Sequence, residues 1–311
     1  MKKIELKAFA KINLSLDVQG LLDNGFHKVE MIMQQILLCD DVSVRWYENH
    51  KESMILIRLS TNRYYLPVDE RNLAYKAAIL MTENFGSGLK GTIRIDIKKR
   101  IPVAAGLAGG SSDCAAVMHA LNVLWDLNLS LEELCSLGAE LGSDVPFCIM
   151  GQAAANEQLA NLFESDPLAC HCALATGTGT RLKPIQGLRS HLILSKPPIS
   201  VSTAEVYKGI DNEKIEKHPD TELLIRALKE NNSSLLEKNM VNVLENFTLK
   251  RYPIIVYTKN KIQDLCKSGC ALMSGSGPTV FGFCENIKEA KAVCGKMLKV
   301  NKESLWTRTT W

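Results

Sequence analysis

A run rich in glycine and alanine, Pro102–Ala116, constrains the fold of this chain more than any other stretch. The residues before it, Thr92–Lys98, alternate between apolar and polar, as in a half-buried β-strand. The residues after it repeat apolar side chains at helical spacing. The run therefore connects a strand to the start of a helix.

The glycines of this run, Gly106, Gly109 and Gly110, predict a phosphate-binding loop. Because glycine tolerates positive φ, backbone N–H groups can converge on a ligand there. The first turn of the helix and its dipole attract an anion to the same place. Ser111 and Ser112 add hydroxyls that can cap the helix or contact a phosphate. A glycine-rich turn with a serine cap is the alternative, since short glycine motifs are not specific.

The loop differs from two familiar nucleotide-binding loops. No Lys-Ser or Lys-Thr pair follows the glycines, so it is not a Walker A loop. It joins a strand to a helix, whereas the glycine-rich loop of protein kinases lies between two strands. A relationship to nucleotide-binding proteins must therefore rest on further motifs.

Composition limits the classes to which the chain can belong. Its 311 residues suffice for one large domain or two smaller ones, and 46% hydrophobic residues can form a substantial core. A net charge of +3 is too small for binding dominated by nucleic acid or a membrane surface. Strands and helices mix without regular βαβα alternation, which predicts an α+β fold.

The cysteines and the N-terminal residues predict a cytoplasmic protein with reduced thiols. The 10 cysteines are scattered, and the first residues lack the apolar segment of a signal peptide. No apolar run is long enough to span a bilayer. Cys170-His171-Cys172 has no second ligand pair at zinc-site spacing, so we predict no metal site there.

Three stretches, in this order, resemble the GHMP kinases, the family of galactokinase, homoserine kinase and mevalonate kinase. They are Ala8–Leu16, Pro102–Ala116 and Met273–Phe281. Three ordered motifs are far more specific than one glycine loop. The resemblance implies an ATP-dependent kinase that uses Mg²⁺ and acts on a small molecule. The motifs are most similar to those of members whose substrate is a cytidine diphosphate conjugate.

The resemblance also implies the domain organisation. A ribosomal-protein-S5-domain-2-like ATP domain would span residues 1–188, and a ferredoxin-like substrate domain would span residues 189–311, with the active site in the cleft between them. The likeness fails at residues 151–172, after an expected strand at Val145–Met150. We interpret this segment as a surface insertion with helical propensity in Ala153–Phe163.

The catalytic and ATP-binding residues follow from the same resemblance. Asp144 matches the family's catalytic aspartate, although a lone acid there would more simply be a turn or cap residue. Lys11 would hold Asp144 ionised and steady the transferring group. Asn72 by itself would be interpreted as a helix cap. The resemblance implies that it lines the adenine pocket. The residues expected to bind ATP are Asn72, Lys99, Pro102, Gly106, Leu107, Ala108, Gly109, Gly110, Ser111 and Ser112.

One residue of the glycine motif departs from the family pattern. Asp113 stands where the resembled enzymes often carry asparagine. A carboxylate there suits the helix dipole, but it could also repel phosphate unless a metal ion bridges the two. The sequence leaves both alternatives open.

Substrate recognition is expected around an aromatic-histidine pair that follows a turn signal at Asp23-Asn24-Gly25. Phe26 and Tyr207 would flank the cytosine, with His27 at its polar edge, although a lone histidine is more often structural. The residues expected to bind substrate are Asn13, Phe26, His27, Thr203, Tyr207, Gly275, Ser276 and Gly277.

Two rival functions remain at this level. The first is another GHMP kinase, acting on mevalonate, homoserine or a sugar, and Phe26-His27 argues against it. The second is a non-catalytic nucleotide-binding protein of the same fold. The presence of both Lys11 and Asp144 argues against lost chemistry.

Overall fold

The computed structural model describes residues 1–23 and 25–311 of the chain. The chain forms two compact units, each assembled from separated segments. Unit 1 comprises Met1–Ala10, Leu38–Ile101 and Ala108–Cys170, and unit 2 comprises Lys11–Leu37, Pro102–Leu107 and His171–Trp311. The domain boundary predicted after residue 188 assumed two continuous segments, 1–188 and 189–311. That boundary stays a prediction. The turn predicted at Asp23-Asn24-Gly25 includes Asn24, which lies outside the described residues.

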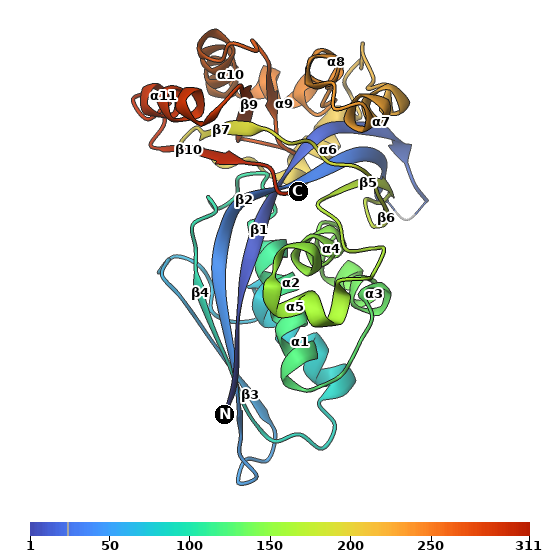
Figure 1. The fold of residues 1–311 in the computed structure, drawn as a ribbon, viewed down its shortest axis with the longest axis vertical. Helices are drawn as coiled ribbons and strands as arrows, with labels where there is room; N and C mark the ends of the chain where they lie inside the picture. The colour runs from blue at the N-terminus through green and yellow to red at the C-terminus, as the bar shows by residue number, and fades with distance from the viewer. Residues whose placement is uncertain (24) are drawn as a thin grey trace. The chain divides into compact units, whose positions relative to one another are not determined.

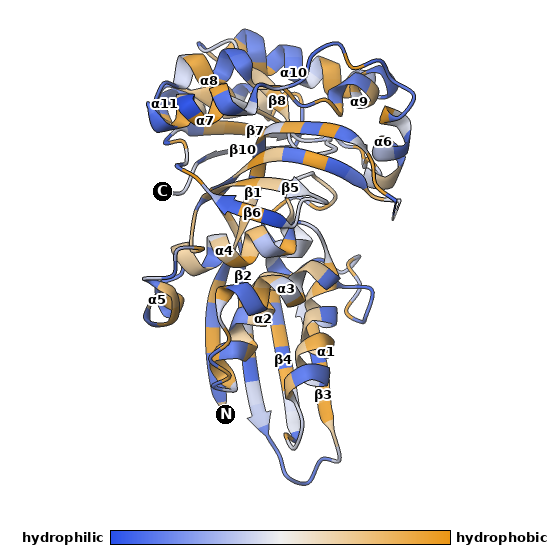
Figure 2. Cartoon of the chain, turned by 90° about the vertical axis from the view of Figure 1, so that its right-hand side faces the viewer, coloured by the Kyte–Doolittle hydropathy of each residue, from blue (hydrophilic) through white to orange (hydrophobic). Residues whose placement is uncertain are grey.

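Two long strands contribute residues to both units. They are β1 (Lys2–Leu21) and β2 (His27–Glu48), which pair with each other. Within unit 1, β2 pairs antiparallel with β4 (Gly91–Lys98), from Asp41 opposite Lys98 to Glu48 opposite Gly91. The short strand β3 (Ile55–Thr61) pairs parallel with β4. The alternation that predicted β4 is visible in Figure 2, and its isoleucines are buried.

Helices complete the core of unit 1, next to the strands in Figure 1. They are α1 (Leu73–Phe85), α2 (Gly109–Leu124), α3 (Leu131–Leu141), α4 (Val145–Ala155) and α5 (Glu157–Phe163). The helix cap expected at Asn72 is confirmed, and α3 also begins with a cap. The Asn72 side chain accepts a hydrogen bond from the N–H of Ala74, and Ser130 and Glu133 form a capping box at the start of α3.

Two expectations for the segment around residue 150 were wrong, whereas the helical propensity expected in Ala153–Phe163 is confirmed by the end of α4 and by α5. Val145–Met150 begins helix α4 and is not a strand. The segment that follows is not a surface excursion, since Leu159 and Phe163 of α5 are 0% and 3% exposed and belong to the unit 1 core. A continuous apolar run cannot be assigned to strand or helix by periodicity, whereas Pro146 in the first turn is typical of a helix start.

This placement gives a stability prediction. Phe163→Ala should lower the free energy of unfolding by about 3–5 kcal/mol, because it removes a buried ring and leaves a cavity. The neighbouring Leu162 is 42% exposed, so Leu162→Ala should stay within about 0.5 kcal/mol of the unchanged protein. Urea denaturation of both variants measures the difference. Equal stability of the two variants would contradict the core assignment of α5.

Unit 2 contains two sets of paired strands. The first part of β2 pairs antiparallel with β5 (Cys172–Gly177), which pairs antiparallel with β6 (Arg181–Pro184). A separate four-stranded antiparallel sheet has the order β10-β7-β9-β8. Its strands are β7 (His191–Lys196), β8 (Ala271–Met273), β9 (Val280–Cys284) and β10 (Glu303–Arg308).

The helices of unit 2 are amphipathic. They are α6 (Thr203–Ile210), α7 (Thr221–Lys229), α8 (Ser233–Asn239), α9 (Glu245–Arg251), α10 (Pro253–Leu265) and α11 (Ile287–Met297). In α11 the hydrophobic residues Ala290, Val293 and Met297 are buried while charged residues face outward. The predicted α+β class is confirmed, and no helix in the described part of the chain is long and apolar enough to cross a bilayer.

Candidate active site

The glycine run of unit 1 ends at the start of α2. Ala108 adopts a left-handed conformation with φ of 57°, and the helix begins at Gly109. The first helical hydrogen bond runs from the N–H of Ser112 to the carbonyl of Ala108, at 2.9 Å. The N–H groups of Gly109, Gly110 and Ser111 therefore have no partner within the helix, and the helix dipole adds positive potential at the same end. This is the geometry of an anion-binding site.

The two serines of this turn have different surroundings. Ser111 is half-buried, whereas Ser112 is fully buried. The Ser112 hydroxyl donates to the carbonyl of Phe9 at 2.7 Å and accepts from the Gln152 side chain at 3.1 Å. Ser112 therefore joins α2 to β1 and α4, and a role for it in phosphate binding stays a prediction.

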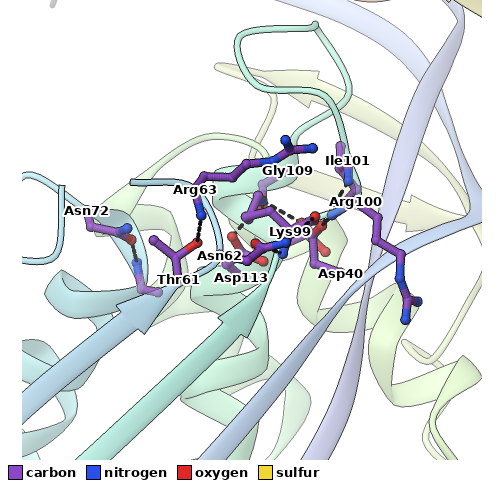
Figure 3. Close-up of polar contacts among 12 residues, drawn as sticks. Asp40, Thr61, Asn62, Arg63, Asn72, Lys99, Arg100, Ile101, Gly109 and Asp113 are labelled. Carbon is purple, nitrogen blue, oxygen red and sulfur yellow. Dashed lines mark hydrogen bonds and ion pairs between the residues drawn. The ribbon is translucent and has the colours of Figure 1, made fainter. Parts of the chain in front are cut away.

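Lys99 follows β4 and lies in a buried cluster of charges, shown in Figure 3. Its ammonium nitrogen is 2.5 Å from Asp40 Oδ2 and 2.7 Å from Asp113 Oδ2. The same nitrogen lies 3.4 Å from the carbonyl oxygen of Gly109. The cluster therefore connects the strands β2 and β4 to the first residues of α2.

The electrostatics of the cluster follow from its burial. The side chains of Lys99, Asp40 and Asp113 are 5%, 0% and 6% exposed. Burial opposes the charged form of Lys99, but Asp113 and Asp40 outweigh it and raise the pKa of the ammonium. Burial also raises the pKa of Asp113, and Asp40 adds to this effect while Lys99 opposes it. Two carboxyl groups thus share one cation.

Two asparagines organise the segments beside this cluster. Asn62 accepts from the N–H of Lys99 at 2.8 Å and donates to its carbonyl at 3.3 Å, which fixes the Lys99 backbone. Asn72 caps α1, and its amide group also donates to the carbonyl of Pro67 at 2.9 Å. The cap predicted for Asn72 is therefore present, and its contact with adenine stays a prediction.

Asp144 lies at the N-terminal end of α4, in unit 1. It is half-buried and occupies the N-cap position, but its side chain does not make the capping hydrogen bond. The positive end of the helix dipole stabilises a carboxylate at such a position. Of the two simpler explanations, the side-chain cap is not made, whereas Asp144 does lie in a turn, closed by the hydrogen bond from the Val145 N–H to the Gly142 carbonyl at 3.1 Å. Its catalytic role stays a prediction.

The first motif places two polar side chains in the interior of unit 2. Lys11 and Asn13 are 4% and 0% exposed, so the strand is buried on both faces here. The Lys11 ammonium donates to Asn13 Oδ1 at 2.8 Å, and the Asn13 amide contacts the sulfur of Met31 at 3.2 Å. Lys11 is therefore not a solvated lysine at a strand edge, which is the usual state of a lone lysine.

The second and third motifs meet within unit 2. The Ser274 hydroxyl donates to the carbonyl of Gly106 at 2.9 Å, and Leu107 accepts from the N–H of Lys11 at 3.2 Å. Gly106 has φ of 71°, and a Cβ atom on it would lie 2.2 Å from the carbonyl oxygen of Ser274. A Cβ atom on Gly275 would lie 3.3 Å from the carbonyl of Gly106 and 3.6 Å from Asn13 Oδ1. Glycine is required at this contact because two backbones approach closely.

The residues predicted to recognise the base also lie in unit 2. The His27 and Tyr207 rings are 5.1 Å apart with an interplanar angle of 40°, and His27 Nε2 is 2.7 Å from Asp211 Oδ1. Phe26 is 60% exposed. Thr203 and Ser276 share a hydrogen bond of 2.9 Å between their hydroxyls.

Several residues of these sites were missed from sequence. Asp211 is 184 positions from His27, and Asp40 is 59 positions from Lys99, so no local spacing joins them. Ser274 directly precedes Gly275, which was predicted. Its position inside the third motif could have identified it as a further site residue from sequence. Lys11 belongs to unit 2 and Asp144 to unit 1, so the predicted residues are divided between the two units.

Family models and relatives match most of the chain. Residues 72–152 match the GHMP kinases N terminal domain, and residues 218–303 match the GHMP kinases C terminal domain. The 4-diphosphocytidyl-2-C-methyl-D-erythritol kinase of Alkaliphilus metalliredigens is 46% identical over 94% of this chain and 91% of its own length. The enzyme of that name from Clostridium botulinum (strain Alaska E43) is 43% identical over 98% of this chain and 100% of its own length.

Solved structures share the whole fold. A crystal structure of a 4-(cytidine 5'-diphospho)-2C-methyl-D-erythritol kinase has a TM-score of 0.77 and 28% identity, covering 99% of this chain and 100% of that chain. A homoserine kinase from Cytophaga hutchinsonii has a TM-score of 0.70 at 19% identity, covering 100% and 95% of the two chains. The second similarity concerns the fold alone.

Proposed function

Because this chain belongs to the GHMP kinase family, we propose that it transfers the γ-phosphoryl group of ATP to the 2-hydroxyl of 4-diphosphocytidyl-2-C-methyl-D-erythritol. This reaction belongs to the non-mevalonate route to isoprenoid precursors. The observation that carries the proposal is the 46% identity, over 94% of the chain, to a kinase named for that substrate.

The geometry of unit 1 supports the ATP part of this proposal. Phosphoryl transfer needs positioning and charge neutralisation more than covalent help from the protein. The N–H groups at the start of α2 would receive the phosphates, and Asn72 would line the adenine pocket. The half-buried carboxylate of Asp144, at the start of α4, would accept or orient the proton of the attacking hydroxyl.

The geometry of unit 2 supports the acceptor part. The tilted His27–Tyr207 ring pair and the exposed Phe26 offer aromatic faces for a pyrimidine. The hydroxyls of Thr203 and Ser276 are within hydrogen-bonding distance of each other and would contact polar groups of the acceptor. Lys11, whose ammonium is held by Asn13, would steady the transferring group.

Mg²⁺ would enter this site with ATP. The described residues contain no group of three or more His, Cys, Asp or Glu side chains arranged to hold a metal ion. Kinase sites commonly bind Mg²⁺ largely through the substrate phosphates, so we infer that the ion would be held mainly through ATP. The ion would supply neutralisation of phosphate charge.

A substrate panel tests the proposal. The protein is assayed with ATP and Mg²⁺ against the cytidyl conjugate, 2-C-methyl-D-erythritol 4-phosphate, mevalonate and homoserine, and the products are identified by mass spectrometry. We expect phosphorylation of the cytidyl conjugate alone. Turnover of mevalonate or homoserine instead would identify a different member of the family, and no turnover with ATP bound would favour a non-catalytic protein.

Phe26→Ala tests the recognition of the base. Stacking of a base on an aromatic ring is worth about 1–3 kcal/mol, so the acceptor KM should rise about tenfold or more while the ATP KM stays nearly unchanged. Tyr257→Ala is the matched control, because it removes another exposed aromatic ring of unit 2, 52% exposed on α10. Steady-state kinetics with each substrate varied in turn give both values. An equal rise in the two KM values would argue against stacking by Phe26.

A further inference from the structure

In the buried cluster of Lys99, Asp40 and Asp113, only Lys99 has been given a role so far, as a residue expected from sequence to bind ATP. Burying three ionisable side chains is costly, and it is tolerated only when the charges are paired and well hydrogen-bonded. All three side chains are 6% exposed or less. A cluster of this kind beside the start of α2 calls for a functional explanation.

The Lys99 side chain is committed within the protein. Its ammonium has two carboxylate partners, at 2.5 and 2.7 Å, and its backbone is bonded at both polar groups by Asn62. A lysine held in this way has few donors left for a nucleotide. The arrangement therefore differs from that of a lysine that reaches into a ligand pocket.

Asp40 and Asp113 have unequal surroundings. Asp40 also accepts hydrogen bonds from the backbone N–H groups of Arg100 and Ile101, so both of its oxygens are satisfied. Asp113 contacts Lys99 through Oδ2, while its buried Oδ1 has no hydrogen-bond partner in the described part of the chain. Asp40 thus anchors the lysine to the strands, and Asp113 is the member that links it to α2.

We propose that Asp113 is a positioning residue for the ATP site, which with Asp40 holds the Lys99 ammonium at the Gly109 carbonyl and so fixes the first turn of α2. The proposal rests on the proposed ATP-binding role of that turn. A Cβ atom on Gly109 would lie 3.3 Å from the Lys99 nitrogen and 3.0 Å from the Ile101 side chain, so the turn is packed directly on the cluster. Displacement of Lys99 would move the N–H groups that receive the phosphates.

A double-mutant cycle on ATP binding tests the proposal. ATP affinity is measured by calorimetry without acceptor, for Asp113→Ala, Lys99→Met and the double variant. A hydrogen bond to a charged group contributes about 1.5–3 kcal/mol. Loss of one N–H contact to a phosphate should therefore weaken ATP binding about tenfold or more in each single variant. The double variant should be no weaker than the weaker single, because either change already breaks the link. Asp113→Asn, which can still accept from Lys99, should stay within about threefold.

Two controls separate positioning from general destabilisation. Asp96→Ala breaks another ion pair of β4, Asp96 Oδ2 to Arg45 Nη1 at 2.6 Å, and should leave ATP affinity unchanged. The acceptor KM of Asp113→Ala should also be unchanged. If Asp113→Ala does not fold, Asp113→Ser replaces it in the cycle, since a serine side chain is too short to restore the contact with Lys99.

The outcomes are distinct. If Lys99 contacted the nucleotide itself, Lys99→Met would weaken ATP binding by the same factor with Asp113 present or replaced, and this additive result would overturn the proposal. Unchanged affinity in Asp113→Ala would also overturn it. The cycle measures ATP binding in the absence of acceptor. Its result can therefore be interpreted even if the protein does not phosphorylate the proposed acceptor.

Discussion

Asp144→Asn should lower kcat by about 10²–10⁴-fold, the contribution typical of a general base, while ATP affinity hardly changes. Asparagine keeps the shape of the side chain and removes its ability to take a proton. The phosphates would bind to backbone N–H groups at the start of α2, which this substitution does not alter. Single-turnover phosphoryl transfer, measured beside ATP affinity, separates the two effects.

Three further variants sharpen this experiment. Asp126→Asn makes the same chemical change at an aspartate of unit 1 whose side chain is 76% exposed, and it should leave kcat unchanged. Lys11→Met should also lower kcat strongly. If Lys11 and Asp144 act jointly in the chemical step, kcat of the double variant should be only slightly lower than kcat of the slower single variant. Near-normal turnover in Asp144→Asn would remove it from the chemical step and leave positioning and the metal ion as the sources of catalysis.

Gly106→Ala should lower phosphoryl transfer about 10²-fold or more. The added Cβ atom would lie 2.2 Å from the Ser274 carbonyl oxygen, so one of the two backbone segments must move. The φ of 71° adds a conformational cost of about 1–2 kcal/mol for a residue with a Cβ atom. A shift of about 1 Å between reacting groups is enough for a loss of this size.

The matched control for this substitution is Gly295→Ala in α11. A Cβ atom on Gly295 meets nothing within 4 Å, and alanine is favoured over glycine in a helix by about 1 kcal/mol. The control should therefore retain full activity and be slightly more stable. Thermal unfolding and kcat are compared for the two variants. Full activity in Gly106→Ala would show that the contact between the second and third motifs is not needed for transfer.

The local elements could largely be predicted from sequence, because each depends on a short pattern. The alternation in Thr92–Lys98 gave β4, and the helical repeat after the glycines gave α2. The resemblance of three motifs to the GHMP kinases is confirmed by matches over most of the chain. Patterns of this length report on propensity and burial, which are local properties.

The parts that were missed depend on contacts between distant residues. Phe163 looked like a surface residue because residues 151–172 carry few large apolar side chains, yet its ring centroid lies 5.5 Å from that of His119. Asp113 could be placed at a helix start, but its partner Lys99 follows β4, and Asp40, the second carboxylate on Lys99, lies on β2. Tertiary pairing of this kind leaves no period in the sequence, so the charge cluster could not be predicted.

The interleaved segments of the two units set the order in which each can be completed during synthesis. Unit 1 ends at Cys170, so all of its residues have been made when the remainder of the chain is still to come. Unit 2 includes Lys11–Leu37, but it also needs β10, which pairs with β7. At about 5–20 residues per second, the remainder takes on the order of ten seconds to translate. The segment Lys11–Leu37, which carries Lys11 and Asn13, is thus made before unit 1 is complete, but its Gln35 carbonyl accepts hydrogen bonds from Thr310 and must wait for that residue.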